Sequence, residues 1–126
     1  MKTIINTTDA PAPIGPYNQA VLAGGFLYVS GQVAINPVTG EMVQTSLKEE
    51  TEQVMRNLNA VLLEADFGFA HILKTTIFLS DMSLFAEVND VYGSYFESEF
   101  PARETVAVKG LPKGANVEIS VIAYKG

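Results

Sequence analysis

The chain has 126 residues, 48% of them hydrophobic and 17% charged, with a net charge of −6 and no cysteine. This composition predicts a single globular domain over residues 1–126 and excludes disulfides, thiolate catalysis and cysteine-ligated metal sites. The lysines and arginines form no basic cluster, and no apolar run could cross a bilayer or act as a signal sequence, so we expect a cytoplasmic protein without nucleic-acid or membrane partners.

The first third of the chain predicts three short strands separated by loops. Residues 2–5 are a strand candidate, and the proline-rich stretch at residues 9–16 indicates an extended, rigid loop. Two apolar runs at residues 18–22 and 26–30 flank a pair of glycines, which is a hairpin signal. The segment at residues 36–40, with proline at its second position, predicts a turn.

The next segment predicts an amphipathic helix. Ser46 and Glu49 match a capping box, apolar residues recur at helical spacing up to Ala65, and Gly68 is a suitable stop. The helix should therefore pack on one side only. Its polar residues fall outside the apolar stripe, and these are Glu49, Glu50, Glu52, Gln53 and Arg56.

A strand, a second helix and two more strands follow. Residues 74–79 are rich in β-branched and aromatic residues, which predicts a strand. Asp81 or Ser83 could cap the second helix, whose apolar face runs from Phe85 to Phe96 and which should end at Phe100-Pro101. The final strands are predicted at residues 103–108 and 117–124.

This order of elements predicts an α+β fold, with one sheet of about half a dozen strands and both helices on one face. A hairpin between the last two strands would place Val108 near Glu118 and Arg103 several residues away. Eight apolar strand residues are more than one face needs, so we expect the open face to contact other copies of the chain. These residues are Val29, Val33, Ile77, Leu79, Val106, Val108, Ile119 and Val121.

The sequence lacks the motifs of several kinds of site. His71 is the only histidine and has no metal-binding partner pattern, so we expect neither a metal site nor a catalytic triad. No glycine-rich phosphate or dinucleotide motif is present.

Arg103 and Glu118 are the main candidates for chemistry. Arg103 is one of only two arginines, and a guanidinium can hold a carboxylate through two parallel N–H···O bonds. Glu118 shares a strand face with Ser120, and its carboxylate could orient or deprotonate a water. A surface ion pair for Arg103 and a solvated polar face for Glu118 are the alternative interpretations.

Four further residues are weaker candidates, each more often structural. Tyr17 ends the rigid loop and could cap a pocket. Ser30 and Gly31 end a strand, where backbone N–H groups could be free. Asn89 is a polar residue near the apolar stripe of the second helix.

Taken together, the sequence resembles the RidA/YjgF family over essentially its whole length. The matching segments are residues 14–20, 29–32, 51–54, 57–58, 74–79, 89–92, 100–103 and 117–119. The resemblance implies a chorismate-mutase-like fold, with a mixed six-stranded sheet and two helices on one face. It also implies a homotrimer with sites between subunits.

The resemblance further implies hydrolysis of 2-iminopropanoate and 2-iminobutanoate to 2-keto acids and ammonia, with no metal or organic cofactor. By the same resemblance, Arg103 would hold the substrate carboxylate and Glu118 would position the attacking water. The rest of the pocket would be lined by Tyr17, Ser30, Gly31, Asn89 and the backbone at Thr105.

Two residues depart from the family pattern, which often has a small residue and then a cysteine after the arginine. Here these residues are Glu104 and Thr105. Strand alternation turns Glu104 away from Arg103, unless a bulge brings it toward the substrate. The substrate preference therefore stays open at this point.

The main alternative to a deaminase is a non-enzymatic module that binds a small carboxylate on the same trimeric scaffold. Chorismate mutase activity is disfavoured, because the only other arginine, Arg56, lies on the polar side of the first helix. RNA cleavage, to which family members have been linked, is disfavoured by the acidic charge.

Overall fold

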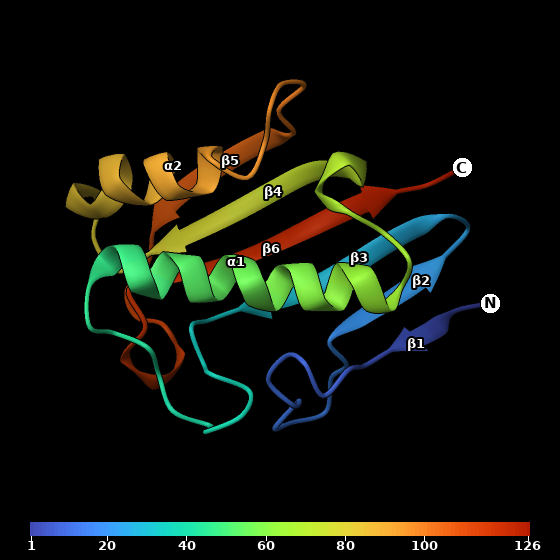
Figure 1. Ribbon diagram of the computed structural model, residues 1–126, viewed down its shortest axis with the longest axis horizontal. Helices are drawn as coiled ribbons and strands as arrows, with labels where there is room; N and C mark the ends of the chain where they lie inside the picture. The colour runs from blue at the N-terminus through green and yellow to red at the C-terminus, as the bar shows by residue number, and fades with distance from the viewer.

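The computed structural model describes all 126 residues and consists of one six-stranded sheet with two α-helices in front of it (Figure 1). Both helices cover the same face of the sheet, so the predicted α+β fold is confirmed. The strands are β1 (Thr3–Ile5), β2 (Ala20–Ala23), β3 (Phe26–Gln32), β4 (Ile72–Leu79), β5 (Ala102–Ala107) and β6 (Val117–Tyr124). The helices are α1 (Leu47–Glu64) and α2 (Phe85–Gly93), with short 3₁₀ helices η1 (Phe69–His71), η2 (Met82–Leu84) and η3 (Pro112–Gly114).

The strands follow the order β1-β2-β3-β6-β4-β5 across the sheet. All neighbours are antiparallel except β4 and β5, which run parallel and are connected through α2. The last two strands do not form a hairpin with each other, because β4 lies between β5 and β6. Arg103 is consequently paired with Thr75 of β4, and Glu118 with Phe78.

The start of α1 is capped as the sequence predicts. Ser46 Oγ accepts a hydrogen bond from the Glu49 amide at 3.0 Å, which satisfies one of the free N–H groups of the first turn. The helix ends before Gly68, because Asp66 takes the left-handed conformation (φ 63°) that glycine usually supplies. The predicted stop residue was therefore wrong, although the helix itself is confirmed.

Two polar residues of α1 that fall outside the apolar stripe are nevertheless buried. Glu50 is 1% exposed, and its carboxylate accepts hydrogen bonds from the amide (2.8 Å) and from Nδ2 (2.9 Å) of Asn116. Gln53 Nε2 donates to Asn57 Oδ1 at 2.9 Å, and Asn57 Nδ2 donates to the Val33 carbonyl oxygen at 3.0 Å. Buried polar groups are normally hydrogen-bonded, and here their partners lie in two loops. The side chains of α1 therefore hold the loop after β3 and the loop before β6 against the helix.

The second helix is shorter than predicted. Asp81 accepts a hydrogen bond from the Ser83 amide at 2.8 Å and caps η2, which leads directly into α2. α2 stops before Tyr95 and Phe96, whose rings pack against Phe69 with centroid distances of 5.4 and 5.8 Å. These aromatic residues cover the edge of the core from a loop and not from the helix.

The core lies between the two helices and the covered face of the sheet. Five of the eight strand residues that were expected to need a second apolar layer belong to this one core. They are at most 4% exposed, and they are Val29, Ile77, Leu79, Ile119 and Val121. That argument for an oligomer was wrong, because α1 and α2 bury these side chains.

The open face of the sheet nevertheless carries other apolar side chains. Strand register places six of them there, namely Phe26, Tyr28, Phe78, Val106, Ile122 and Tyr124. Tyr28 is 50% exposed and Val106 is 45% exposed. An exposed apolar sheet face is typical of a protein contact surface.

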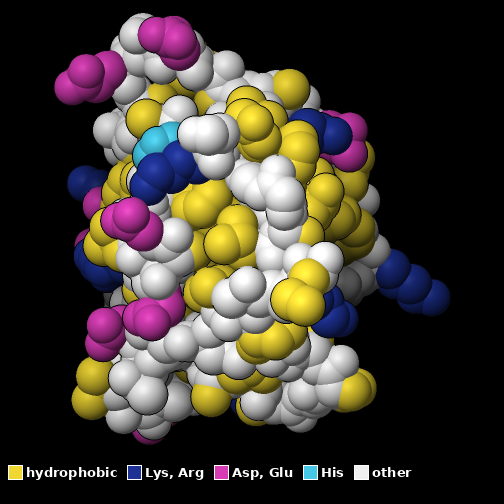
Figure 2. Space-filling view, turned by 90° about the vertical axis from the view of Figure 1, so that its right-hand side faces the viewer, with side chains coloured by type: hydrophobic (Ala, Val, Ile, Leu, Met, Phe, Trp, Pro, Cys, Tyr) yellow, Lys and Arg dark blue, Asp and Glu magenta, His cyan; other side chains and the backbone are white.

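Hydrophobic side chains also gather at one end of the molecule. Figure 2 looks at the end that lies to the right in Figure 1, where the hairpin of β2 and β3 and the C-terminus meet. Most of the visible acidic side chains lie toward the left margin of this view. A membrane-spanning helix would need a longer apolar stretch than any helix of this fold provides.

Candidate functional site

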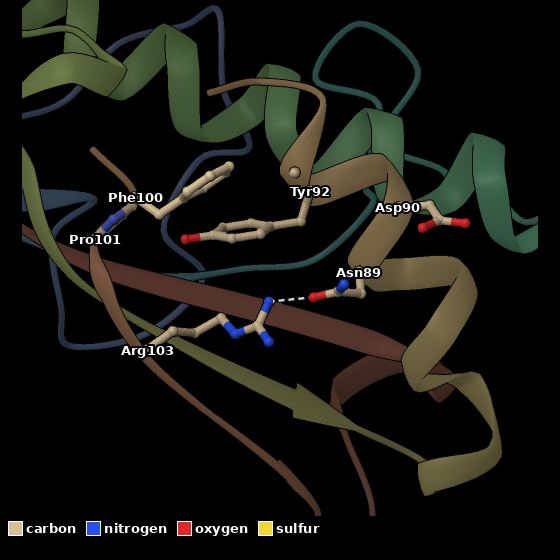
Figure 3. A pocket seen from close by; sticks show the side chains of 7 residues that line it. Asn89, Asp90, Tyr92, Phe100, Pro101 and Arg103 are labelled. Carbon is tan, nitrogen blue, oxygen red and sulfur yellow. Dashed lines mark hydrogen bonds between the residues drawn. The ribbon is translucent and has the colours of Figure 1, made fainter. Parts of the chain in front are cut away.

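Arg103 extends from the edge strand β5 toward α2. It pairs with Thr75, which is fully buried under the helices, so both side chains point to the covered face of the sheet. The guanidinium carbon lies 5.5 Å from the ring centroid of Phe85 and 5.4 Å from that of Tyr92. Its Nη1 donates to Asn89 Oδ1 at 2.5 Å (Figure 3). The structure thus brings Asn89 and Arg103 together, and the three side chains that contact the guanidinium all belong to α2.

Tyr92 is itself held firmly in place. It is 4% exposed, and its hydroxyl donates a hydrogen bond to Thr75 Oγ1 at 2.9 Å. Burial raises the pKa of the Tyr92 hydroxyl, while the hydrogen bond to Thr75 and the charge of Arg103 act in the opposite direction. The ring beside Arg103 is therefore neutral and fixed at its far end to β4.

The guanidinium lines a cavity of about 540 Å³, which we call the Arg103 pocket. Its lining residues are Asn89, Asp90, Tyr92, Gly93, Phe100, Pro101 and Arg103. In Figure 3 the carboxylate of Asp90 points away from Arg103, and the salt bridges of the chain involve other residues. An arginine carries five donors in a planar fork, and only one of them is used here. The remaining donors suit a carboxylate held by two parallel hydrogen bonds.

Glu118 lies on the open face of β6. Its neighbours Val117 and Ile119 are buried on the other face, as strand alternation predicts. Burial raises the pKa of the Glu118 carboxyl group. The carboxyl group lines a second, smaller cavity of about 100 Å³, the Glu118 pocket, which also includes Tyr17, Gly31 and Pro112.

Gly31 gives Glu118 the space it occupies. The pairing of β3 with β6 shifts register between Val29 and Gln32, so Ser30 and Gly31 form a bulge. A Cβ atom at Gly31 would lie 2.8 Å from Glu118 Cδ, closer than side chains approach one another. Any larger residue at position 31 would therefore force the glutamate side chain to shift.

Tyr17 and Ser30 adjoin this part of the molecule in different ways. Tyr17 lines the Glu118 pocket and is 49% exposed. The Ser30 hydroxyl donates to the Asn18 carbonyl oxygen at 2.6 Å, and the Ser30 amide donates to the Gln19 carbonyl oxygen at 2.9 Å. The free backbone amide that we expected at Ser30 is therefore not found. β3 continues to Gln32, and the Ser30 amide donates to the segment that precedes β2.

Arg103 and Glu118 do not meet within one chain. β4 lies between their strands, and their positions differ by three residues along it, so their Cα atoms are about 14 Å apart by standard sheet geometry. Their side chains also leave the sheet on opposite faces. A small substrate cannot contact both groups of the same chain.

The two residues that depart from the family pattern are also on opposite faces. Glu104 faces away from Arg103, as predicted, and its carboxylate lies 3.7 Å from Lys74 Nζ. The register of β5 with β4 is continuous, so no bulge turns Glu104 toward the pocket. Thr105 shares the covered face with Arg103, and its hydroxyl oxygen is buried without a hydrogen-bond partner.

Sequence reasoning missed the two rings that flank Arg103. It assigned Phe85 and Tyr92 only to the apolar stripe of the second helix. With Asn89 they fall at positions i, i+4 and i+7, which lie on one face of a helix. A polar residue between two aromatic residues at this spacing is the signal that could have identified them.

His71 has a local structural role. Its Nδ1 accepts a hydrogen bond from the Gly68 amide at 2.9 Å, and its ring packs edge-on against Phe67. Nowhere in the chain do three or more histidine, aspartate and glutamate side chains lie close enough to hold a metal ion.

The whole chain is similar to proteins to which different roles are ascribed. The family model described as Endoribonuclease L-PSP matches residues 7–125. A 2-iminobutanoate/2-iminopropanoate deaminase from Bos taurus is 44% identical over 126 residues, which cover 100% of this chain and 92% of that protein. AldR from Lactococcus lactis, to which a regulatory role is ascribed, is 50% identical over 120 residues, 95% of each chain. A solved structure from Yersinia pestis, of a Rid family protein of unknown function, has a TM-score of 0.96 and 49% identity, covering 99% of this chain and 100% of that one.

Proposed function

Because the chain belongs to the Endoribonuclease L-PSP family, which is the RidA/YjgF family, we propose that it hydrolyses 2-iminopropanoate and 2-iminobutanoate to 2-keto acids and ammonia. The observation that carries the proposal is the Arg103 guanidinium, which α2 holds in a pocket with most of its donors free. The deaminase from Bos taurus, similar over the whole chain, supports this substrate class.

In this proposal Arg103 binds the carboxylate of the imino acid. Two parallel N–H···O bonds fix the carboxylate plane, and with it the orientation of the adjacent imine carbon. A charge-assisted hydrogen bond of this kind contributes about 1.5–3 kcal/mol. Because a protonated imine is already electrophilic, the protein mainly has to orient the imine carbon toward the attacking water.

Glu118 positions the attacking water and accepts its proton as the oxygen bonds to the imine carbon. The nitrogen is then protonated, the C–N bond breaks, and ammonia leaves as the carbonyl forms, so one water is consumed for each ammonia released. Burial raises the pKa of Glu118. A carboxyl group whose pKa lies closer to the working pH can both accept a proton and return it. Turnover should accordingly fall on the acid side at a pH above the ordinary carboxyl pKa of 4.5.

The complete site in this proposal contains two copies of the chain. Arg103 and Glu118 leave the sheet on opposite faces, so the edge strand β5 of one subunit would approach the open face of the next. The apolar side chains on that face, such as Tyr28 and Val106, would form the contact. A homotrimer closes this head-to-tail arrangement into a ring and gives one site at each of its three interfaces.

A second function is non-enzymatic binding of a small carboxylate for regulation, which is favoured by the role ascribed to the relative from Lactococcus lactis. Binding alone requires Arg103 but makes no demand on Glu118. The two functions therefore differ in what the Glu118→Gln variant should do.

The test generates imines in situ with a pyridoxal-phosphate dehydratase and measures keto-acid release in competition with semicarbazide. The deaminase proposal predicts that the wild type accelerates release, that Arg103→Ala abolishes both turnover and binding of 2-oxobutanoate, and that Glu118→Gln abolishes turnover alone. Binding of 2-oxobutanoate without any acceleration by the wild type would favour the regulatory module. Wild-type turnover by a folded Arg103→Ala variant would contradict the assignment of Arg103.

A further inference from the structure

Phe85 has an environment that core packing does not explain. It is the first residue of α2, it is 36% exposed, and it is not one of the buried core residues. No other aromatic ring of the chain pairs with it. The guanidinium of Arg103 lies over it, with its central carbon 5.5 Å from the ring centroid.

A cation within about 6 Å of a ring centroid is attracted by the negative face of the ring. Both Phe85 and Tyr92 meet this condition for Arg103. The guanidinium is a planar, weakly hydrated cation that stacks well on aromatic faces. The hydrogen bond to Asn89 fixes one of its nitrogens, so the two rings and the amide together limit how the guanidinium can turn.

We propose that Phe85 is a positioning residue that acts through Arg103, holding its guanidinium in the orientation that receives the substrate carboxylate. This inference rests on the proposed function. A group that is ordered before binding loses less conformational freedom when the ligand arrives. Phe85 therefore sets the affinity for the carboxylate and leaves the chemical step to other groups.

The proposal predicts a particular split of the kinetic constants. Phe85→Leu keeps an apolar side chain but removes the aromatic face, and it should raise KM for the imine about 3- to 30-fold, the range of a partly to a fully desolvated cation–π contact. It should leave kcat within about twofold of the wild type, because the lost interaction is the same in the ground state and the transition state. Phe85→Tyr restores an aromatic face and should restore KM.

The experiment measures kcat and KM together with the Kd for 2-oxobutanoate, determined by calorimetry, in the wild type and the variants Phe85→Leu, Phe85→Tyr and Phe69→Leu. Phe69→Leu is the matched control, because it removes a ring from the separate cluster with Tyr95 and Phe96. Only Phe85→Leu should weaken KM and Kd. If its thermal unfolding shows that this variant does not fold, Phe85→Met replaces it, since methionine adapts to irregular spaces.

The outcomes separate this inference from the proposed function. If the wild type turns over imines but Phe85→Leu matches it in KM and Kd, or if Phe85→Tyr is no better than Phe85→Leu, the positioning role is wrong. If the wild type binds 2-oxobutanoate without turnover, the deaminase proposal fails and the Kd comparison still decides the role of Phe85. A wild type that binds no carboxylate overturns both.

Discussion

Gly31 and Glu118 lie close together in the candidate site. The glutamate side chain occupies the space in which a Cβ of residue 31 would stand. Sequence reasoning could select Glu118 from strand alternation, but it could not explain Gly31, because the contact crosses from β3 to β6 at a bulge. The backbone of residue 31 has no positive φ, so an alanine at this position would be opposed by the Glu118 side chain and not by backbone strain.

Replacing Gly31 by alanine should therefore displace the Glu118 carboxylate. In the proposed mechanism this moves the attacking water, and a displacement of about 1 Å can lower turnover by roughly 10- to 100-fold. The measurement is kcat for the imine. Gly110→Ala is the matched control, because a Cβ at Gly110 would meet nothing within 4 Å. Wild-type kcat in a folded Gly31→Ala variant would contradict the role given to Glu118.

The raised pKa of Glu118 also makes a prediction about stability. Because burial raises this pKa above 4.5 in the folded chain, the folded state binds the proton more tightly than the unfolded state. The ionised carboxylate therefore lowers stability at neutral pH, and this loss disappears as the pH falls below 4.5, where both states are protonated. We expect Glu118→Gln to have a higher free energy of unfolding than the wild type at pH 7.

Urea denaturation at a fixed protein concentration measures this difference at several pH values. The curves of the wild type and Glu118→Gln should converge below pH 4.5. The control Glu104→Gln, which removes a carboxylate beside Lys74 on the same face, should show no gain at pH 7. If the wild type instead loses stability relative to Glu118→Gln as the pH falls, the ionised carboxylate is stabilising and the prediction is wrong.

At the level of elements, local patterns predicted most helices and strands, because each pattern reports which face of an element is buried. They could not predict the strand order, because β6 enters the sheet between β3 and β4, which are distant from it in sequence. The succession of β4, α2 and β5 does indicate a parallel pair, since parallel neighbours need a long crossover connection. That crossover places α2 over β5, which explains how Asn89 comes to bind Arg103.

The cap of α1 gives a prediction for an element. Ser46→Ala removes the hydrogen bond that Ser46 Oγ accepts from the Glu49 amide, and it should lower the free energy of unfolding by about 1 kcal/mol. Chemical denaturation measures this loss. Ser98→Ala is the control, because Ser98 is exposed on a loop. Equal losses in the two variants would mean that the cap contributes nothing.

For the whole molecule, our proposal links assembly to activity through the open face of the sheet. The residues first selected for this face are mostly core residues, because periodicity alone does not say which of two faces the helices cover. The face that is open carries Tyr28 and Val106, both about half exposed. In our proposal this face completes the site of a neighbouring subunit, so a separated chain should be inactive.

Light scattering should accordingly give a mass of about three times the 13.6 kDa of one chain. Tyr28→Glu places a charge on the open face and should both dissociate the assembly and abolish imine turnover, because an unpaired charge is costly to bury. Val38→Glu is the control, since Val38 is 91% exposed outside the sheet. A monomeric wild type with full turnover would contradict the shared site.

The most direct test of the account mixes two inactive variants, Arg103→Ala and Glu118→Gln, by co-expression or by joint refolding. If each site takes Arg103 from one subunit and Glu118 from the next, random mixed trimers contain some sites in which both groups are intact. The account predicts that an equal mixture recovers about a quarter of the wild-type kcat per site, while each variant alone stays inactive. A mixture that forms mixed trimers but is no more active than its separate components would contradict it.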